Sequence, residues 1–195
     1  MGIRSNSQDI FENNKTTLKE TSKDNSNKEL SYMTNSQLEV VDFDGVKSEY
    51  IRGMRLIDTP CSSDALYSGN DDNVYLIEFK NGIMDNKTVY NVQEKIYTSL
   101  LIYTDIVGEG ISECRTKLNY ILVYNEKKNT NKIEGDGSKQ EVQDTAKRRI
   151  GKYFTQKAKG NFIAFGLEKF EGIYFKNVYT YNEKEFQEKF VDVYE

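Results

Sequence analysis

The chain has 195 residues, which is enough for one domain with a hydrophobic core and too few for two. It contains no histidine, and this excludes histidine-activated serine and cysteine nucleophiles, histidine-based nucleases and most zinc sites. The net charge of −4 argues against a protein that coats nucleic acid nonspecifically. It is compatible with an enzyme that meets phosphates at one local site.

The expected compartment follows from the apolar residues and the cysteines. No apolar run approaches the roughly 18 residues that a membrane span needs, and the N-terminus lacks the hydrophobic stretch of a signal peptide. We therefore expect a cytoplasmic protein without a membrane partner, in which Cys61 and Cys114 are free thiols. Carboxylates are then the main candidate metal ligands, and without histidine they favour hard ions such as Mg²⁺ or Mn²⁺.

The first part of the chain is polar. Residues 1–28 consist mostly of Asn, Ser, Lys, Thr, Asp and Glu, and this composition predicts a flexible leader before a single domain over residues 29–195. Irregularly spaced apolar residues predict a partly helical segment over 29–51, and a strand is expected over 52–57.

The centre of the chain has the clearest pattern. Residues 64–67 and 74–80 are rich in residues that favour strands, and the turn-forming sequence SGNDDN joins them into a hairpin. Apolar residues at positions 92, 96, 100 and 103 have the spacing of one helix face, which predicts an amphipathic helix over 89–106. The sequence LNYILVY over 118–124 is typical of a buried strand.

The last third of the chain alternates between polar and aromatic segments. The expected elements are a polar loop over 125–138, a helix over 139–158, strands over 162–165 and 172–181, and a helix over 183–193. Together with the central hairpin and helix, this order predicts an α/β (α+β) fold in which helices flank a mixed central sheet on both sides.

Two acidic residues and a lysine are predicted to meet on one face of the hairpin. If the turn is centred near Asp71, Asp64 lies opposite Glu78, and opposed residues of an antiparallel pair point to the same face. Lys80 follows Glu78 by two positions, so its side chain projects from that face as well. A shift of the register by one residue would move Asp64 to the other face.

This arrangement points to a metal-dependent site. Two carboxylates at such a distance repel each other, and a divalent cation between them favours their joint deprotonation. Such an ion would polarise a phosphate group, with Asp64, Glu78 and the backbone carbonyl of Phe79 as its ligands. Lys80 would orient or deprotonate the attacking water. The alternative is that Glu78 and Lys80 form only a solvated cross-strand pair at a strand end.

The segments that carry this constellation resemble the PD-(D/E)XK nuclease-like superfamily. They are PCSSD over 60–64 and YLIEFKNG over 75–82, followed by a helix, and the resemblance covers roughly residues 50–125. It implies a restriction-endonuclease-like core of a helix, three antiparallel strands, a helix and a parallel strand. It also implies that Asp64 and Glu78 ligate Mg²⁺ and that Lys80 is the catalytic lysine of a hydrolase.

The resemblance extends to the helix after the hairpin. Some branches of the superfamily carry Gln and Tyr four residues apart there, and Gln93 and Tyr97 have this spacing. Residues four apart share a helix face, so both would reach toward the substrate strand or the lysine; alternatively, Tyr97 packs beside its apolar neighbours. Lys95, between them, is expected to be a solvated helix residue. Many members also place an acid on the first helix, for which Glu39 and Glu49 are both candidates.

The resulting prediction is a Mg²⁺-dependent phosphodiesterase that cleaves DNA, or less favourably RNA, by in-line attack of water on the backbone. Two alternatives from other classes stay open. One is a catalytically inactive protein of the same fold that binds a protein or nucleic-acid partner. The other is an immunity or regulatory protein whose acidic surface meets a basic partner.

Overall fold

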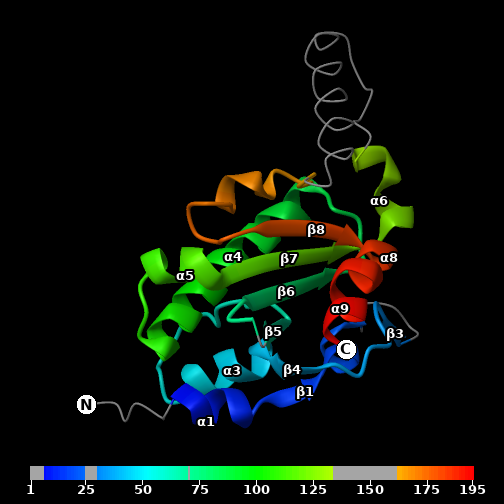
Figure 1. Ribbon diagram of the computed structural model, residues 1–195. Helices are drawn as coiled ribbons and strands as arrows, with labels where there is room; N and C mark the ends of the chain where they lie inside the picture. The colour runs from blue at the N-terminus through cyan, green and yellow to red at the C-terminus, as the bar shows by residue number, and fades with distance from the viewer. Residues whose placement is uncertain (1–6, 25–29, 70, 134–161) are drawn as a thin grey trace.

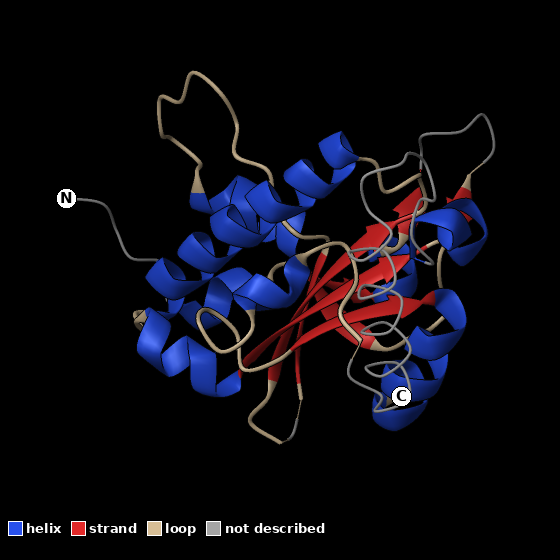
Figure 2. Ribbon diagram, turned by 90° about the horizontal axis from the view of Figure 1, so that it is seen from above, coloured by secondary structure: helices blue, strands red, loops and turns tan. Residues whose placement is uncertain are grey.

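A mixed sheet forms the centre of the molecule. The computed structural model describes residues 7–24, 30–69, 71–133 and 162–195. Six strands form one sheet, and helices cover both of its faces (Figure 1 and Figure 2). The predicted α/β class, with a mixed sheet between helices, is confirmed. None of the described helices combines the length and the apolar character needed to span a membrane.

The strands follow the order β1–β4–β5–β6–β7–β8 across the sheet. Their bounds are β1 (Lys15–Thr17), β4 (Glu39–Asp42), β5 (Ala65–Ser68), β6 (Val74–Lys80), β7 (Leu118–Tyr124) and β8 (Val178–Asn182). Adjacent strands from β1 to β6 are antiparallel to each other, whereas β7 runs parallel to β6 and β8 runs parallel to β7. Two short strands, β2 (Lys23–Asp24) and β3 (Ser31–Tyr32), form a separate antiparallel pair.

Helices connect and cover these strands. The described helical elements are α1 (Ser7–Glu12), α2 (Leu18–Thr21), α3 (Phe43–Tyr50), α4 (Asn86–Val107), α5 (Ile111–Lys117), α6 (Glu126–Ile133), η1 (Leu167–Phe170), α8 (Glu183–Phe186), the π-helical η2 (Gln187–Val191) and α9 (Asp192–Tyr194). The long helix α4 belongs to the crossover between the parallel strands β6 and β7. It begins where the Asp85 side chain accepts a hydrogen bond from the Thr88 N–H at 2.7 Å, and it ends at Gly108, whose φ is 72°.

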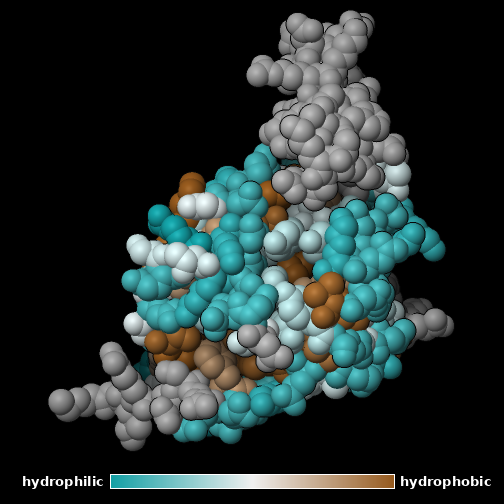
Figure 3. All heavy atoms as spheres, viewed as in Figure 1, coloured by the Kyte–Doolittle hydropathy of each residue, from teal (hydrophilic) through white to brown (hydrophobic). Residues whose placement is uncertain are grey.

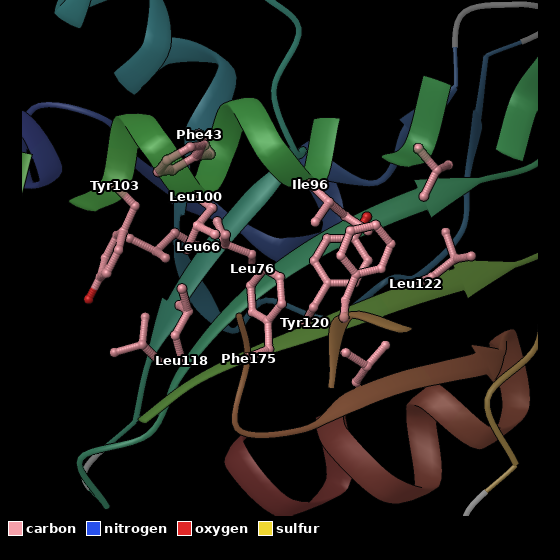
Figure 4. Packing of buried hydrophobic residues seen from close by; sticks show 14 of the residues in the cluster. Phe43, Leu66, Leu76, Ile96, Leu100, Tyr103, Leu118, Tyr120, Leu122 and Phe175 are labelled. Atoms are coloured by element: carbon pink, nitrogen blue, oxygen red, sulfur yellow. The ribbon is translucent and has the colours of Figure 1, made fainter. Parts of the chain in front are cut away.

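The strands β6 and β7 are buried on both faces because helices cover each side. On one face, Leu76 and Tyr120 pack with Ile96 of α4, as Figure 4 shows. On the other face, the ring of Phe79 meets the ring of Phe186 at a centroid distance of 5.6 Å. Even-numbered residues of β6 therefore face α4, and odd-numbered residues face the C-terminal helices.

The predicted central elements are confirmed. In the hairpin, Ala65 pairs with Ile77, which is the register of a turn centred near Asp71. The helix expected over 89–106 is α4, and the strand expected over 118–124 is β7. The C-terminal helix is also present, as the consecutive turns α8, η2 and α9, and both cysteines are free thiols.

The flexible leader expected over residues 1–28 is wrong for the part that the structure describes, residues 7–24. This segment contains α1, β1 and α2, and β1 pairs with β4. Its few apolar residues anchor it, because Ile10 is 3% exposed and Leu18 is fully buried. The segment therefore belongs to the domain that was expected to begin at residue 29.

Two predicted connections also differ from the structure. The strand expected over 52–57 is an exposed loop between α3 and β5 that lies outside the six-stranded sheet. The loop expected over 125–138 begins instead with α6. The Asn125 side chain starts this helix by accepting a hydrogen bond from the Lys128 N–H at 3.1 Å.

The segment before β8 is irregular. The strand expected over 162–165 is absent, because Phe165 and Gly166 have φ values of 60° and 69° that turn the chain. The strand expected over 172–181 begins only at Val178, as β8. The helix expected over 139–158 lies outside the described residues.

Candidate functional site

Asp64 stands immediately before β5, where the chain enters the sheet. Its N–H donates to the Ile77 carbonyl at 3.0 Å, and its carbonyl accepts from the Phe43 N–H at 3.2 Å. Its carboxylate accepts a hydrogen bond from the Phe79 N–H at 2.6 Å. Both the backbone and the side chain of Asp64 are thereby fixed beside β6.

Glu78 and Lys80 project from β6 toward α4, on the face that also carries Asp64. The Glu78 side chain is fully buried, and Lys80 Nζ lies 2.6 Å from Glu78 Oε1. The structure thus brings together the three residues Asp64, Glu78 and Lys80 that the hairpin register predicts to converge.

Lys95 of α4 completes the group, and the prediction of a solvated helix residue is wrong. Its Nζ lies 2.8 Å and 3.1 Å from the two carboxylate oxygens of Glu78, and 3.1 Å from Oδ1 of Asp64. It follows Val92 by three residues and precedes Ser99 by four, and both of these are buried. This spacing is the sequence signal for an inward-facing lysine. We call Asp64, Glu78, Lys80 and Lys95 the charged cluster.

The two carboxylates of the charged cluster depend on nearby positive charge. Burial, and then the charge of Glu78, raises the pKa of Asp64 to about 7, although Lys95 and the Phe79 N–H act in the opposite direction. Burial also opposes the charge of Lys95, but the two carboxylates outweigh it and raise the Lys95 pKa above its usual range. The site therefore holds two acids that need a cation, and Lys95 supplies one.

One side of the charged cluster is open to solvent. The side chains of Asp64 and Lys95 are each 18% exposed and that of Lys80 is 22% exposed, whereas Glu78 lies at the base without exposure. A phosphate that approaches from solvent would therefore meet both lysines and Asp64 before it meets Glu78.

The acids of the charged cluster and the adjacent backbone carry oxygen atoms of the kind that divalent metal ions bind, and Lys95 and the Phe79 N–H contact the carboxylate oxygens in this structure. The Lys80 carbonyl accepts from the Asn125 N–H on the β7 side of β6, and successive carbonyls of a strand alternate between its two sides. The Phe79 carbonyl therefore faces the β5 side, where its N–H meets Asp64. Asp64, Glu78 and this carbonyl offer the oxygen atoms that Mg²⁺ and Mn²⁺ prefer. No three His, Cys, Asp or Glu side chains of the described residues gather as a metal-binding group, so water or substrate oxygens would complete the coordination.

Gln93 and Tyr97 lie on the other flank of α4, about 160° to 200° around the helix axis from Lys95. The Gln93 side chain accepts a hydrogen bond from Lys169 Nζ at 2.9 Å. The ring of Tyr97 packs against that of Phe170 at a centroid distance of 5.3 Å. The expected approach of this pair to the lysine is therefore wrong, whereas a reach toward a substrate strand stays a prediction. Tyr97 has a packing role in this structure.

Neither candidate for a further acid on the first helix reaches the charged cluster. Glu39 is exposed on β4, where its carboxylate lies 3.1 Å from Lys15 Nζ. Glu49 accepts a hydrogen bond from the Asn14 side chain at 3.2 Å. Both acids are engaged at the N-terminal segment of the domain.

Asp44, in the first turn of α3, is the acid that the sequence pattern does not reveal. Its burial would raise its pKa, but hydrogen bonds from Lys47 and Ser62 and the charge of Lys95 lower it overall. Ser62 precedes Asp64 by two residues, so its hydroxyl links α3 to the segment that carries the acid. Asp44 therefore belongs to the electrostatic surroundings of the charged cluster.

No family model, curated protein or solved structure matches the chain.

Proposed function

We propose that the protein is a cytoplasmic nuclease that hydrolyses phosphodiester bonds with Mg²⁺ or Mn²⁺ and acts on DNA in preference to RNA. The observation that carries this proposal is the charged cluster, in which acids beside two neighbouring strands meet lysines from a strand and a helix. The two lysines of the charged cluster are partly exposed and suit an anionic phosphate. A divalent ion would take the place that Lys95 holds between the two carboxylates.

The strand order supports the same proposal. The strands β4, β5 and β6 are antiparallel, and α4 then leads to β7, which is parallel to β6. The resemblance to the PD-(D/E)XK superfamily implies this sequence of three antiparallel strands, a helix and a parallel strand. The position of α3 departs from that order, because this helix stands between β4 and β5.

The residues of the charged cluster have distinct roles in this proposal. Bound Mg²⁺ or Mn²⁺ would supply Lewis acidity that polarises the phosphate and makes water more acidic. Asp64 and Glu78 would hold the ion, and the Phe79 N–H keeps the Asp64 carboxylate in place. Lys80 would orient the attacking water, and Lys95 would move from the acids to stabilise the negative charge that develops on the phosphate.

A catalytically inactive protein of the same fold, which binds a protein or nucleic-acid partner, is the second candidate. Lys95 favours it, because the contacts of this lysine to Asp64 and Glu78 neutralise both acids without a metal ion. In such a protein the charged cluster would be a structural ion-pair network.

Cleavage of a mixed nucleic-acid panel separates the two candidates. Labelled single-stranded and double-stranded DNA and RNA would be incubated with the wild type in Mg²⁺, Mn²⁺ or EDTA. We expect metal-dependent cleavage that is lost in Glu78→Gln and reduced about 100-fold to 1000-fold in Lys80→Met.

The matched control is Glu109→Gln, which alters an acid paired with Lys117 at 2.6 Å outside the charged cluster. This variant should cleave as the wild type does. If the wild type cuts no substrate with either metal, the nuclease proposal fails and the inactive binding protein is favoured.

A further inference from the structure

An exposed loop leads from α3 toward the charged cluster. Every residue over 52–59 is exposed, and Met54, Leu56 and Ile57 expose 50%, 48% and 101% of their surface. Hydrophilic residues cover most of the described surface on the face drawn in Figure 3. We call residues 52–59 the projecting loop. Neighbouring large apolar side chains in solvent mark an interaction surface.

The projecting loop is also basic. Arg52 and Arg55 are exposed beside the three apolar residues, and Asp58 is the single acid of this stretch. Two arginines and one aspartate give the loop a net charge of +1, in a chain whose net charge is −4. This positive charge favours an anionic partner. The apolar side chains favour a partner that has an apolar surface, or a gap between apolar groups, against which they can pack.

The base of the projecting loop is anchored next to the charged cluster. The Thr98 hydroxyl of α4 donates to the Cys61 carbonyl, just after the loop. Thr98 follows Lys95 by three residues, which is less than one helical turn. From Asp64 the chain can extend over at most about 24 Å to Ile57. A nucleic acid with one phosphate at the charged cluster is therefore within reach of the loop.

We propose that the projecting loop binds double-stranded nucleic acid through its minor groove. Arg52 and Arg55 contact phosphates, while Met54, Leu56 and Ile57 insert as a wedge between base pairs and bend the duplex. Minor-groove proteins use aliphatic wedges of this kind together with basic side chains. A single strand is disfavoured, because proteins bind it by stacking bases on aromatic rings and the loop contains none. The inference rests on the proposed nuclease function and specifies its substrate as a duplex.

Binding of a short labelled duplex in EDTA tests the basic residues without cleavage. We expect Arg52→Gln/Arg55→Gln to weaken binding about tenfold. The slope of log affinity against log salt should fall in magnitude by about 1.8, since each phosphate contact contributes roughly 0.9. Arg115→Gln, which changes an exposed arginine of α5, is the matched control and should bind as the wild type does.

Unstacking of the bases tests the apolar residues. A duplex with a fluorescent base analogue, whose emission rises on unstacking, should brighten when the wild type binds. Met54→Ser/Leu56→Ser/Ile57→Ser should abolish this rise while circular dichroism stays unchanged. Ile173→Ser, at an apolar residue that is 53% exposed outside the loop, is the control and should preserve the rise.

Duplex binding and unstacking that persist in both loop variants would overturn the inference. Metal-dependent cleavage of the same duplex by the wild type, in a parallel assay with Mg²⁺ or Mn²⁺ in place of EDTA, would then show that the nuclease function stands without the inference. Binding to anionic phospholipid vesicles in place of the duplex, if lost on the same substitutions, would overturn the inference in favour of a membrane surface.

Discussion

Lys95 joins the carboxylates of Asp64 and Glu78, and its substitution would show how much this link contributes to stability. Lys95→Met removes one of two lysine contacts from the fully buried Glu78. We expect a loss of about 3 kcal/mol in the free energy of unfolding, measured with urea in EDTA, because a buried carboxylate loses one of its two lysine partners. Mn²⁺ should restore part of this loss by replacing the missing charge.

Lys117→Met is the control for this substitution. It breaks a Lys–Glu pair of 2.6 Å whose side chains are 33% and 31% exposed. The loss should stay below about 1 kcal/mol, because solvent screens a partly exposed pair. Equal losses in the two variants would contradict a special role for Lys95.

The pKa of Asp64 predicts how the stability of the metal-free protein depends on pH. An unfolded Asp has a pKa of about 3.9, whereas in the folded protein burial, and then the charge of Glu78, raises the pKa of Asp64 to about 7 against the opposing charges of Lys95 and Lys80. The folded state therefore binds the proton more tightly. The stability gained from this proton is complete below about pH 4 and is lost as the pH rises through about 7.

Comparison of the wild type with Asp64→Asn isolates this effect. The free energy of unfolding of the wild type, relative to the variant, should fall when the pH rises from about 5 to about 8. Urea unfolding at both pH values measures the difference. A relative stability that increases over this range would be inconsistent with the raised pKa of Asp64.

At the scale of the elements, the N-terminal segment 7–24 is part of the sheet and its core. Leu18 of α2 is fully buried, so Leu18→Ala should reduce the free energy of unfolding by about 3 kcal/mol. Leu30→Ala removes the same atoms from a side chain that is 53% exposed and should cost less than about 0.5 kcal/mol. Thermal or urea unfolding measures both values. A small loss in both variants would favour a loosely attached leader.

The sequence predicts those elements whose pattern is set locally. The hairpin register follows from a turn near Asp71, and α4 follows from the regular spacing of its apolar face. The sequence pattern does not reveal that the N-terminal segment is part of the sheet and the core. Its isolated apolar residues, such as Leu18, stand among polar residues and are buried only by contact with residues far away in the sequence. A polar composition by itself therefore does not separate a leader from an edge strand.

The charged cluster is only partly predictable for a similar reason. Asp64, Glu78 and Lys80 follow from one hairpin, whose geometry is local. Lys95 comes from α4, and its role depends on which flank of this helix faces β5. Asp44 is linked to the segment that carries Asp64 by its hydrogen bond with Ser62. A tertiary contact of this kind leaves no periodic signal in the sequence.

At the scale of the whole molecule, the chain is acidic, but the charged cluster and the projecting loop both carry basic side chains. The net charge of −4 disfavours general adhesion to nucleic acid, whereas the charged cluster supplies two lysines and the projecting loop, which ends five residues before Asp64, supplies two arginines. The sheet holds the acids on rigid strands, and the loop extends from them into solvent. Contact with a nucleic acid should therefore be confined to this side of the molecule.

Calorimetric titration of Mn²⁺ into the wild type and into Glu78→Gln tests the proposed metal site most directly. At about pH 8, where Asp64 is ionised, we expect one Mn²⁺ site per chain in the wild type and none in the variant. Unchanged binding in Glu78→Gln, or the absence of a site in the wild type, would contradict a metal site in the charged cluster.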